Sequence, residues 1–559
     1  MVEQAGAAPR AGSIGRGRHA KRATGAEPGG LIRSSALMVV GTLASRATGM
    51  FRLMLQAAAL GTLAVGGSYN TANTLPTSLY TLIIGGALNS VLVPQLVRAR
   101  IEHADGGRAH EQRLVTLVLS VLAIGTAVAV LMAPQLVGLY MPDSPGNHQL
   151  FELTVTFARF LLPQVFFYGL FFMLGQLLNA RGRFGAMMWT PVLNNIVLIA
   201  MFGLYMWLVP SPAGAADVTP GQVRMLGIGT TVGIALQALC LIPFLAGSGF
   251  QWRPRFDWRG VGLRKSVSAA RWTLLFVLVN QVALTVVTRY ANAADAQLPR
   301  AGAGNSAYFF AQNIWMLPQA IITVSLVTAL LPQMSRAVAE HRLDDMRDDL
   351  SRCLRVTAVA IVPAAFFFLA FGPQIAVVMF SYSSGGAASA LPLGQMLQAF
   401  ALGLIPFSAQ YLLLRGFYAF EDTRTPFWMA VWISAFDIVL ATGCHLLLPA
   451  RWAVIGMAAA YAASYTAGLL ITGMRLRRRM EGRLDGKRLL RAYGKLALAG
   501  ATAGLVGWAA AHICADLVAS PAAGSLLALL AGGGVMLALF LLLARLLRIS
   551  ELRGLPGLS

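Results

Sequence analysis

The sequence predicts an all-α polytopic membrane protein with about fourteen transmembrane helices, arranged as two parallel six-helix lobes followed by two C-terminal helices. Its composition supports this fold class, because 57% of the 559 residues are hydrophobic and only 12% are charged, unlike a soluble globular domain. A second observation is a series of apolar stretches of about 20 residues, the length that an α-helix needs to cross a bilayer. A third is an internal repeat that relates the two halves of the chain.

The apolar stretches define the expected helices in chain order. They lie near residues 31–60, 69–97, 114–140, 154–180, 184–208, 222–248, 266–291, 305–333, 353–380, 392–420, 426–449, 452–474, 492–514 and 522–544. Several contain prolines, namely Pro76, Pro94, Pro163, Pro318, Pro332, Pro363 and Pro406. Such breaks suit helices that bend during alternating access, and the alternative is ordinary kinks that improve packing.

The distribution of lysine and arginine predicts the orientation in the membrane. With the N-terminus in the cytoplasm, almost every basic residue outside the spans lies in the cytoplasmic tail and loops, and only Arg300 and Arg451 lie in external loops. This bias predicts a multi-pass protein of the cytoplasmic membrane with both termini in the cytoplasm. It also accounts for the net charge of +22 without a nucleic-acid partner, since basic clusters at helix ends face anionic membrane lipids. Residues 1–30 are expected to form a disordered basic cytoplasmic tail, and a cleaved signal peptide is the alternative.

Short matches between the two halves define the repeat. The second and eighth stretches both contain Leu-Pro and both end in Pro-Gln-x-x-Arg-Ala, at Pro94–Ala99 and Pro332–Ala337. A second match relates Pro163, Arg181 and Phe184 to Pro406, Arg424 and Phe427. Six helices per repeat preserve orientation, so an axis along the membrane normal relates the lobes. The predicted units are an N-lobe (31–248), a C-lobe (266–475) and helices 13 and 14 (490–547).

Two arginines within the first apolar stretch, Arg46 and Arg52, are the strongest functional signal. A charged side chain at the bilayer centre costs roughly 2.5–3.5 kcal/mol on insertion scales, so the helix is expected to line a polar cavity that holds an anion. Six residues on a regular helix separate the two side chains by about 120°, which allows them to clasp a large anion such as a diphosphate. The alternative is that one of them snorkels to an interface or pairs with a backbone carbonyl.

Further polar residues of the spans are candidates for lining the same cavity: Asn70, Asn73, Tyr80, Asn89, Gln312 and Asn313. Each has the alternative role of a hydrogen-bond partner between helices. Asp437 lies deep in the eleventh stretch, where it either binds a coupling cation or proton or pairs with Arg415 of the preceding helix.

The sequence contains no pattern typical of an enzyme or a cofactor site. Its seven histidines lie mostly in loops or at span ends, without a P-loop, a His-x-x-x-His motif or paired intramembrane carboxylates. The four cysteines, Cys240, Cys353, Cys444 and Cys514, lack the spacing of a metal site or a disulfide framework. We therefore expect a transporter without a metal or cofactor, which runs on a gradient, on the membrane potential or downhill.

Three sequence segments resemble the MurJ (MviN) family of bacterial lipid II flippases, within the multidrug/oligosaccharidyl-lipid/polysaccharide exporter superfamily. They are Ser45-Arg46-x-x-Gly49-x-x-Arg52, the frame from Leu75-Pro76 to Val93-Pro94, and the stretch Arg415–Pro426. The resemblance implies fourteen helices and the export of undecaprenyl-diphosphate-linked peptidoglycan precursor to the outer leaflet. It also implies that cavity arginines hold the diphosphate and that the lipid tail lies toward the last two helices.

The chain departs from this family at several charged positions. Tyr80-Thr81 replaces an Arg-Arg pair of the second helix, and Gln312-Asn313 replaces an Asp-Arg pair of the eighth. Val287 occupies the position where the family has an acidic residue in the seventh helix, so Asp437 alone matches the family's sodium site. Two alternatives therefore stay open: an exporter of another polyprenyl-linked glycan or a drug, and a non-transporting scaffold of cell-wall assembly. If a diphosphate is bound, Arg46 and Arg52 must hold most of it.

Overall fold

The chain is described here from a computed structural model. It covers residues 28–551, except for gaps at 62–63, 84–106, 182, 184, 210–216, 251, 258–262, 299–300, 383–385, 483, 516 and 550. All regular elements within these residues are helical, and eleven helices are long and apolar enough to cross a membrane. The prediction of an all-α polytopic membrane protein is therefore confirmed. The expected spans around α1, α2 and α12–α13 are not among the eleven, so the number fourteen stays a prediction.

The first half of the chain forms one group of helices. These are α1 (Pro28–Leu60), α2 (Ala64–Tyr80), α4 (Arg108–Leu131), α5 (Ala133–Tyr140), α6 (His148–Leu161), α7 (Gln164–Asn179), α8 (Gly185–Leu208), α9 (Pro220–Leu239) and α10 (Leu241–Ala246). Their apolar faces build two buried clusters, one around Phe157 and Phe202 and the other around Met173 and Leu177.

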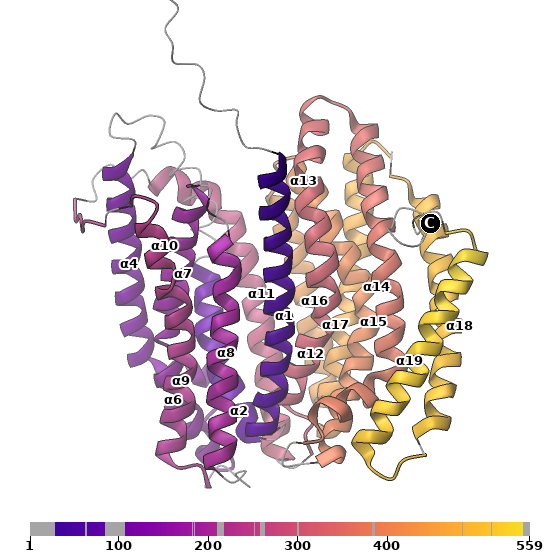
Figure 1. Ribbon diagram of the computed structural model, residues 1–559, viewed down its shortest axis with the longest axis horizontal. Coiled ribbons are helices and arrows are strands. Elements are labelled where there is room, and N and C mark those ends of the chain that lie inside the picture. The colour runs from indigo at the N-terminus through magenta and orange to yellow at the C-terminus, as the bar shows by residue number, and fades with distance from the viewer. Residues whose placement is uncertain are drawn as a thin grey trace, which may run out of the picture.

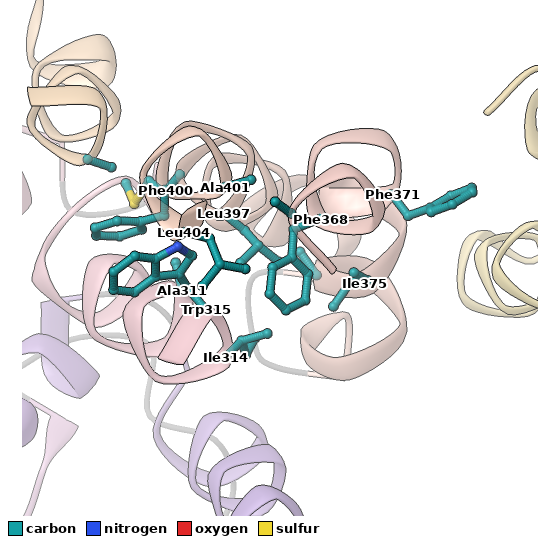
Figure 2. Close-up of a cluster of buried hydrophobic side chains, with 14 of the residues drawn as sticks. Ala311, Ile314, Trp315, Phe368, Phe371, Ile375, Leu397, Phe400, Ala401 and Leu404 are labelled. Carbon is teal, nitrogen blue, oxygen red and sulfur yellow. The ribbon is translucent and has the colours of Figure 1, made fainter. Parts of the chain in front are cut away.

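The second half forms the other group. Its helices are α11 (Leu263–Gln297), α12 (Asn305–Pro318), the π-helical turn η3 (Gln319–Thr323), α13 (Val324–Ala339), α14 (Leu343–Phe380), α15 (Gly386–Ala419), α16 (Arg424–Leu447) and α17 (Ala450–Arg479). The two helices that follow are α18 (Gly486–Ala515) and α19 (Pro521–Leu546). Buried hydrophobic side chains of α12, α14 and α15 pack together in the core of this half (Figure 2), where Trp315 and Phe400 stack with ring centroids 5.4 Å apart.

The two groups lie side by side with their helices roughly parallel, and α1 lies between them (Figure 1). The start of α1 and the end of α19 are at the same end of the bundle (Figure 1). This arrangement agrees with both termini on one side of a membrane. The domain limits predicted from the sequence, at residues 248, 266, 475 and 490, stay predictions.

The Leu-Pro motif of each repeat is followed by a local change in helix type. Pro76 lies in α2, which turns π-helical at residues 81–83, and Pro318 ends α12 just before η3. A proline removes one backbone donor and clashes with the preceding turn, so the hydrogen-bond register shifts there. Pro163 similarly separates α6 from α7, whereas Pro363 and Pro406 lie within continuous helices. Pro94 lies outside the described residues.

The C-terminal pair α18–α19 packs against α14 through glycines. A Cβ atom on Gly507 would lie 2.6 Å from the carbonyl oxygen of Gly532, so the two backbones approach more closely than larger residues allow. The ring of Phe371 contacts both positions, and Figure 2 shows this side chain pointing toward the C-terminal pair. Small residues at such a crossing are typical of helix packing in membranes.

Candidate functional site

Helix α1 is held against α8 next to its two arginines. The side-chain amide of Asn195 donates hydrogen bonds to the Ser45 carbonyl oxygen and to the Thr48 hydroxyl, both at 3.0 Å. Gly49 leaves room for this amide, since a Cβ there would lie 3.5 Å from Asn195 Nδ2. The motif around Gly49 thus fixes the rotation of α1 and, with it, the directions of Arg46 and Arg52.

Arg46 lies on the stripe of α1 that faces the second half of the chain. Positions 46, 50, 53 and 57 follow one helical face, and Leu53 and Ala57 are buried in the core cluster of the second half, with Met50 packed against it. Arg46 itself is exposed. The two groups of helices are therefore in contact at Leu53 and Ala57. Arg46 lies closer to the start of α1, where its side chain stays accessible.

Arg52 points away from Arg46, into the first group of helices. It is half-buried, and its Nε is buried without a hydrogen-bond partner in the described part of the chain. Tyr69 of α2 and Tyr168 of α7 lie within electrostatic range of its guanidinium. The structure therefore places Arg46 and Arg52 on different faces of α1, as their spacing predicts, and each meets a different set of polar groups.

Asn73 and Tyr80 lie with Tyr69 and Thr77 on one stripe of α2, which we term the α2 polar stripe. Gln164 of α7 makes a long contact of 3.5 Å with Asn73, and the rings of Tyr80 and Tyr168 pack with centroids 5.1 Å apart. Three predicted residues, Arg52, Asn73 and Tyr80, are thus brought to the same side of the first group. Asn89, also predicted to line the cavity, lies outside the described residues.

A second polar region surrounds Asp437 at the junction of α2 with the second half. A cavity of about 280 Å³ lies there, bordered by Thr81 from the end of α2 and by residues of α11, α12, α16 and α17. Its polar lining includes Asn280, Gln281, Tyr308, Gln312, Ser434, Asp437, Tyr461 and Tyr465. Val287, the position where the family resemblance places an acid, also borders the cavity. Within this lining, Asp437 is the one carboxylate.

Asp437 is 5% exposed, and its Oδ1 has no hydrogen-bond partner among the residues that the structure describes. Arg415 lies instead over the rings of Tyr411 and Tyr418, at 4.4 and 5.4 Å from their centroids. The ion pair between Asp437 and Arg415 that the sequence allowed is therefore not formed. A buried carboxylate without a cationic partner is costly as long as it is charged.

The other two predicted residues of this half behave differently from each other. Gln312 borders the cavity of Asp437. Asn313 donates a hydrogen bond of 2.8 Å to the Phe309 carbonyl oxygen of its own helix, which is the bond a polar residue makes within an apolar helix.

A buried hydrogen-bond network joins the two halves where α1 ends and α2 begins. Asn70 donates to the Ser306 hydroxyl at 3.1 Å, and Gln56 donates to Asn70 at 2.7 Å. Thr71 donates to Asn292 at 3.0 Å and accepts from Asn305 at 2.8 Å. We call this set, which connects α1 and α2 with α11 and α12, the interlobe network. Because every member is fully or almost fully buried, this end of the bundle is closed.

Asp295 adjoins the interlobe network and was missed from the sequence. It lies two residues before the end of α11, is 3% exposed, and accepts a hydrogen bond of 2.9 Å from the Asn305 backbone. The apolar pattern of the seventh stretch ends near residue 291, so hydropathy places Asp295 in a loop. The tyrosines of the cavity were missed as well, although Tyr461 and Tyr465 are four residues apart and so share one helix face.

Comparison with known proteins gives a consistent set of relatives. Residues 56–523 match the family model described as "Lipid II flippase MurJ". The chain is 29% identical over 415 residues to the "Probable lipid II flippase MurJ" of Rhizobium meliloti, covering 74% of this chain and 75% of that protein. It is 26% identical over 394 residues to the "Lipid II flippase MurJ" of Burkholderia cenocepacia, covering 70% of this chain and 73% of that protein.

Solved structures share the fold. A "Lipid II flippase MurJ, inward closed conformation" superposes with a TM-score of 0.70 at 18% identity, covering 92% of this chain and 99% of that chain. An inward-facing multidrug resistance MATE transporter of the MOP superfamily superposes with a TM-score of 0.62 at 14% identity, covering 80% and 98%. At these identities the structural likeness concerns the fold alone.

Proposed function

The chain belongs to the lipid II flippase MurJ family, and we propose that it carries lipid-linked peptidoglycan precursor from the inner to the outer leaflet of the cytoplasmic membrane by alternating access. The observation that carries this proposal is the family match over residues 56–523, which runs from the last turn of α1 to the first turn of α19. The protein acts as a transporter, with the lipid-linked precursor as its substrate and membrane lipids around it.

The diphosphate of the precursor would bind beside α1. Arg52 has an unpaired Nε, and Asn73 and Tyr80 of the α2 polar stripe lie on the same side. A diphosphate there supplies the anionic acceptors that a guanidinium favours. Arg46, exposed on the face toward the second half, meets the substrate as it enters between the two groups of helices, and Gln312 contacts it from the opposite side.

The closed and open ends of the bundle define the transport step. The interlobe network closes the end where α1 meets α2, while Arg46 is exposed toward the other end. With both termini in the cytoplasm, as the positive-inside rule favours, the closed end faces outward. Export then requires that the interlobe network breaks and that the halves close around the level of Arg46.

Asp437 is the candidate for energy coupling. It faces a cavity at the junction of the two halves, with hydroxyl groups of Tyr308, Ser434 and Tyr465 around it and no cationic side chain among its described neighbours. Binding of a proton or cation removes the cost of a buried charge and favours the state in which the cavity is closed to water. Loss of the ion favours hydration and opening.

Genetic replacement tests the function. When the native lipid II flippase of a bacterial host is depleted, this gene should restore growth and labelled lipid II in the outer leaflet. Arg52→Ala should abolish the rescue at normal membrane levels, whereas Arg52→Lys should retain part of it, because the charge remains and only the planar fork is lost. Failure of the unmodified gene would overturn the proposed function, and full rescue by Arg52→Ala would overturn the role of Arg52.

A further inference from the structure

A second polar pocket lies away from the substrate path, at the end of the bundle where α4 begins and α10 ends. It has a volume of about 370 Å³, and its described lining contains four arginines, Arg108, Arg181, Arg253 and Arg255, but a single carboxylate, Glu111. We call it the arginine pocket. It lies at the same end as the start of α1 and the end of α19 (Figure 1), which the positive-inside rule places in the cytoplasm.

The base of the arginine pocket is rigid. Arg181 Nη2 and Glu111 Oε2 form an ion pair of 2.6 Å, and Glu111 is 2% exposed. Arg181 also donates to the Leu177 carbonyl oxygen at 2.9 Å and lies 5.1 Å from the centroid of the Phe250 ring. A buried ion pair that is hydrogen-bonded and packed in this way holds its geometry.

The rim of the pocket is held by a separate set of contacts. The segment 252–257 is fixed to α4, because the Arg255 backbone donates to Thr116 Oγ1 at 3.1 Å and Arg113 donates to Asp257 at 2.8 Å. The hydrogen bond from Arg113 keeps the pKa of the Asp257 carboxyl below its ordinary value, so this pair stays charged. Arg253 and Arg255 are thereby presented on an anchored segment, and both are exposed.

The charges of the pocket do not balance. Glu111 neutralises Arg181 and Asp257 neutralises Arg113, which leaves Arg108, Arg253 and Arg255 without a carboxylate at ion-pairing distance among the described residues. Three guanidinium groups around one cavity repel each other unless an anion or solvent lies between them. Guanidinium groups match phosphate oxygens in geometry and charge, and helix ends at a cytoplasmic membrane surface meet anionic headgroups.

We propose that the arginine pocket binds a phosphate group through Arg108, Arg253 and Arg255, supplied either by an anionic phospholipid headgroup or by a free phosphate compound of the cytoplasm. The pocket is separate from Arg46, Arg52 and Asp437. Binding there acts on α4, α7 and the segment 252–257, all within the first group of helices, and it is independent of whether the protein transports lipid II.

Trp252, adjacent to Arg253 and 55% exposed, offers a reporter for the test. The full chain is placed in nanodiscs of phosphatidylcholine with added phosphatidylglycerol. Two samples are compared, in which either the phosphatidylglycerol or the phosphatidylcholine carries bromine atoms near the headgroup end of its acyl chains. The quenching of tryptophan fluorescence is measured for the unmodified chain and for Trp252→Phe, and the difference between the two is the quenching of Trp252. A parallel titration adds inorganic phosphate to nanodiscs of phosphatidylcholine alone.

Stronger quenching by brominated phosphatidylglycerol than by brominated phosphatidylcholine would support the headgroup source. A saturable change with inorganic phosphate would support the free source. In either case the double variant Arg253→Gln/Arg255→Gln should weaken binding on the order of tenfold or more, since it removes two charge-assisted hydrogen-bond donors, with an unchanged thermal midpoint.

The matched control is Arg477→Gln/Arg478→Gln, which removes the same charge from the exposed end of α17 but leaves the arginine pocket intact. It should bind as tightly as the unmodified chain. Equal weakening by the two double variants, or the absence of any response to either phosphate source, would overturn the proposal.

Discussion

Thr71 is the residue whose replacement tests the interlobe network most directly. Its hydroxyl both donates to Asn292 of α11 and accepts from Asn305 of α12, so a single oxygen joins α2 to two helices of the other half. Thr71→Val keeps the shape and removes both bonds. Each lost bond leaves one buried polar atom, Asn292 Oδ1 or Asn305 Nδ2, without its Thr71 partner, at a cost of about 1–3 kcal/mol per atom.

This cost falls on the closed state alone, because separation of the halves exposes both asparagines to water. Taking about 2 kcal/mol as the net effect, the ratio of open to closed protein should rise roughly 30-fold. The distance between spin labels at Gly146→Cys and Arg451→Cys reports this ratio. Both positions are exposed at the closed end, one in each half, and the four native cysteines would be replaced by alanine.

Thr230→Val is the matched control. Thr230 is buried and its hydroxyl bonds to Tyr69 at 2.8 Å, but both residues belong to the first half. Its replacement should lower the thermal midpoint without lengthening the label distance. The reasoning is refuted if Thr71→Val leaves the distance distribution unchanged, or if Thr230→Val shifts it equally.

Two further changes have defined outcomes. Asp437→Asn should remove the dependence of lipid II transport on an imposed proton or sodium gradient in proteoliposomes, because a neutral amide binds neither ion as a carboxylate does. The control Ser434→Ala should keep this gradient dependence. Unchanged gradient dependence in Asp437→Asn would return Asp437 to a structural role. Gly507→Ala should destabilise the chain by about 1–3 kcal/mol through overpacking, since its Cβ would meet Gly532. Gly534→Ala, where a Cβ meets open space, should leave the thermal midpoint equal or higher, and equal loss in both glycine variants would contradict the packing argument.

Much of the architecture follows from local sequence properties. Hydropathy over about 20 residues reports the spans because each helix satisfies its own backbone groups in lipid. The sequence marked Pro76 and Pro318 as interruptions of their spans, and the structure adds that π-helical residues follow both of them. Hydropathy was less reliable at span ends, where it placed Asp295 in a loop although α11 continues to Gln297. Burial at a helix end depends on what packs against it.

The sequence by itself determined that this is an all-α polytopic membrane protein, that Arg46 and Arg52 diverge by about 120°, and that Asp437 lies within an apolar helix. Tertiary structure alone decided that Arg52 faces the α2 polar stripe, that Arg46 remains exposed between the halves, that Arg415 stacks on tyrosines rather than pairing with Asp437, and that Thr71 joins Asn292 and Asn305. The physical reason is range. Hydropathy and helix rotation are set within a few turns of chain, whereas these partners meet only after helices distant in sequence pack together.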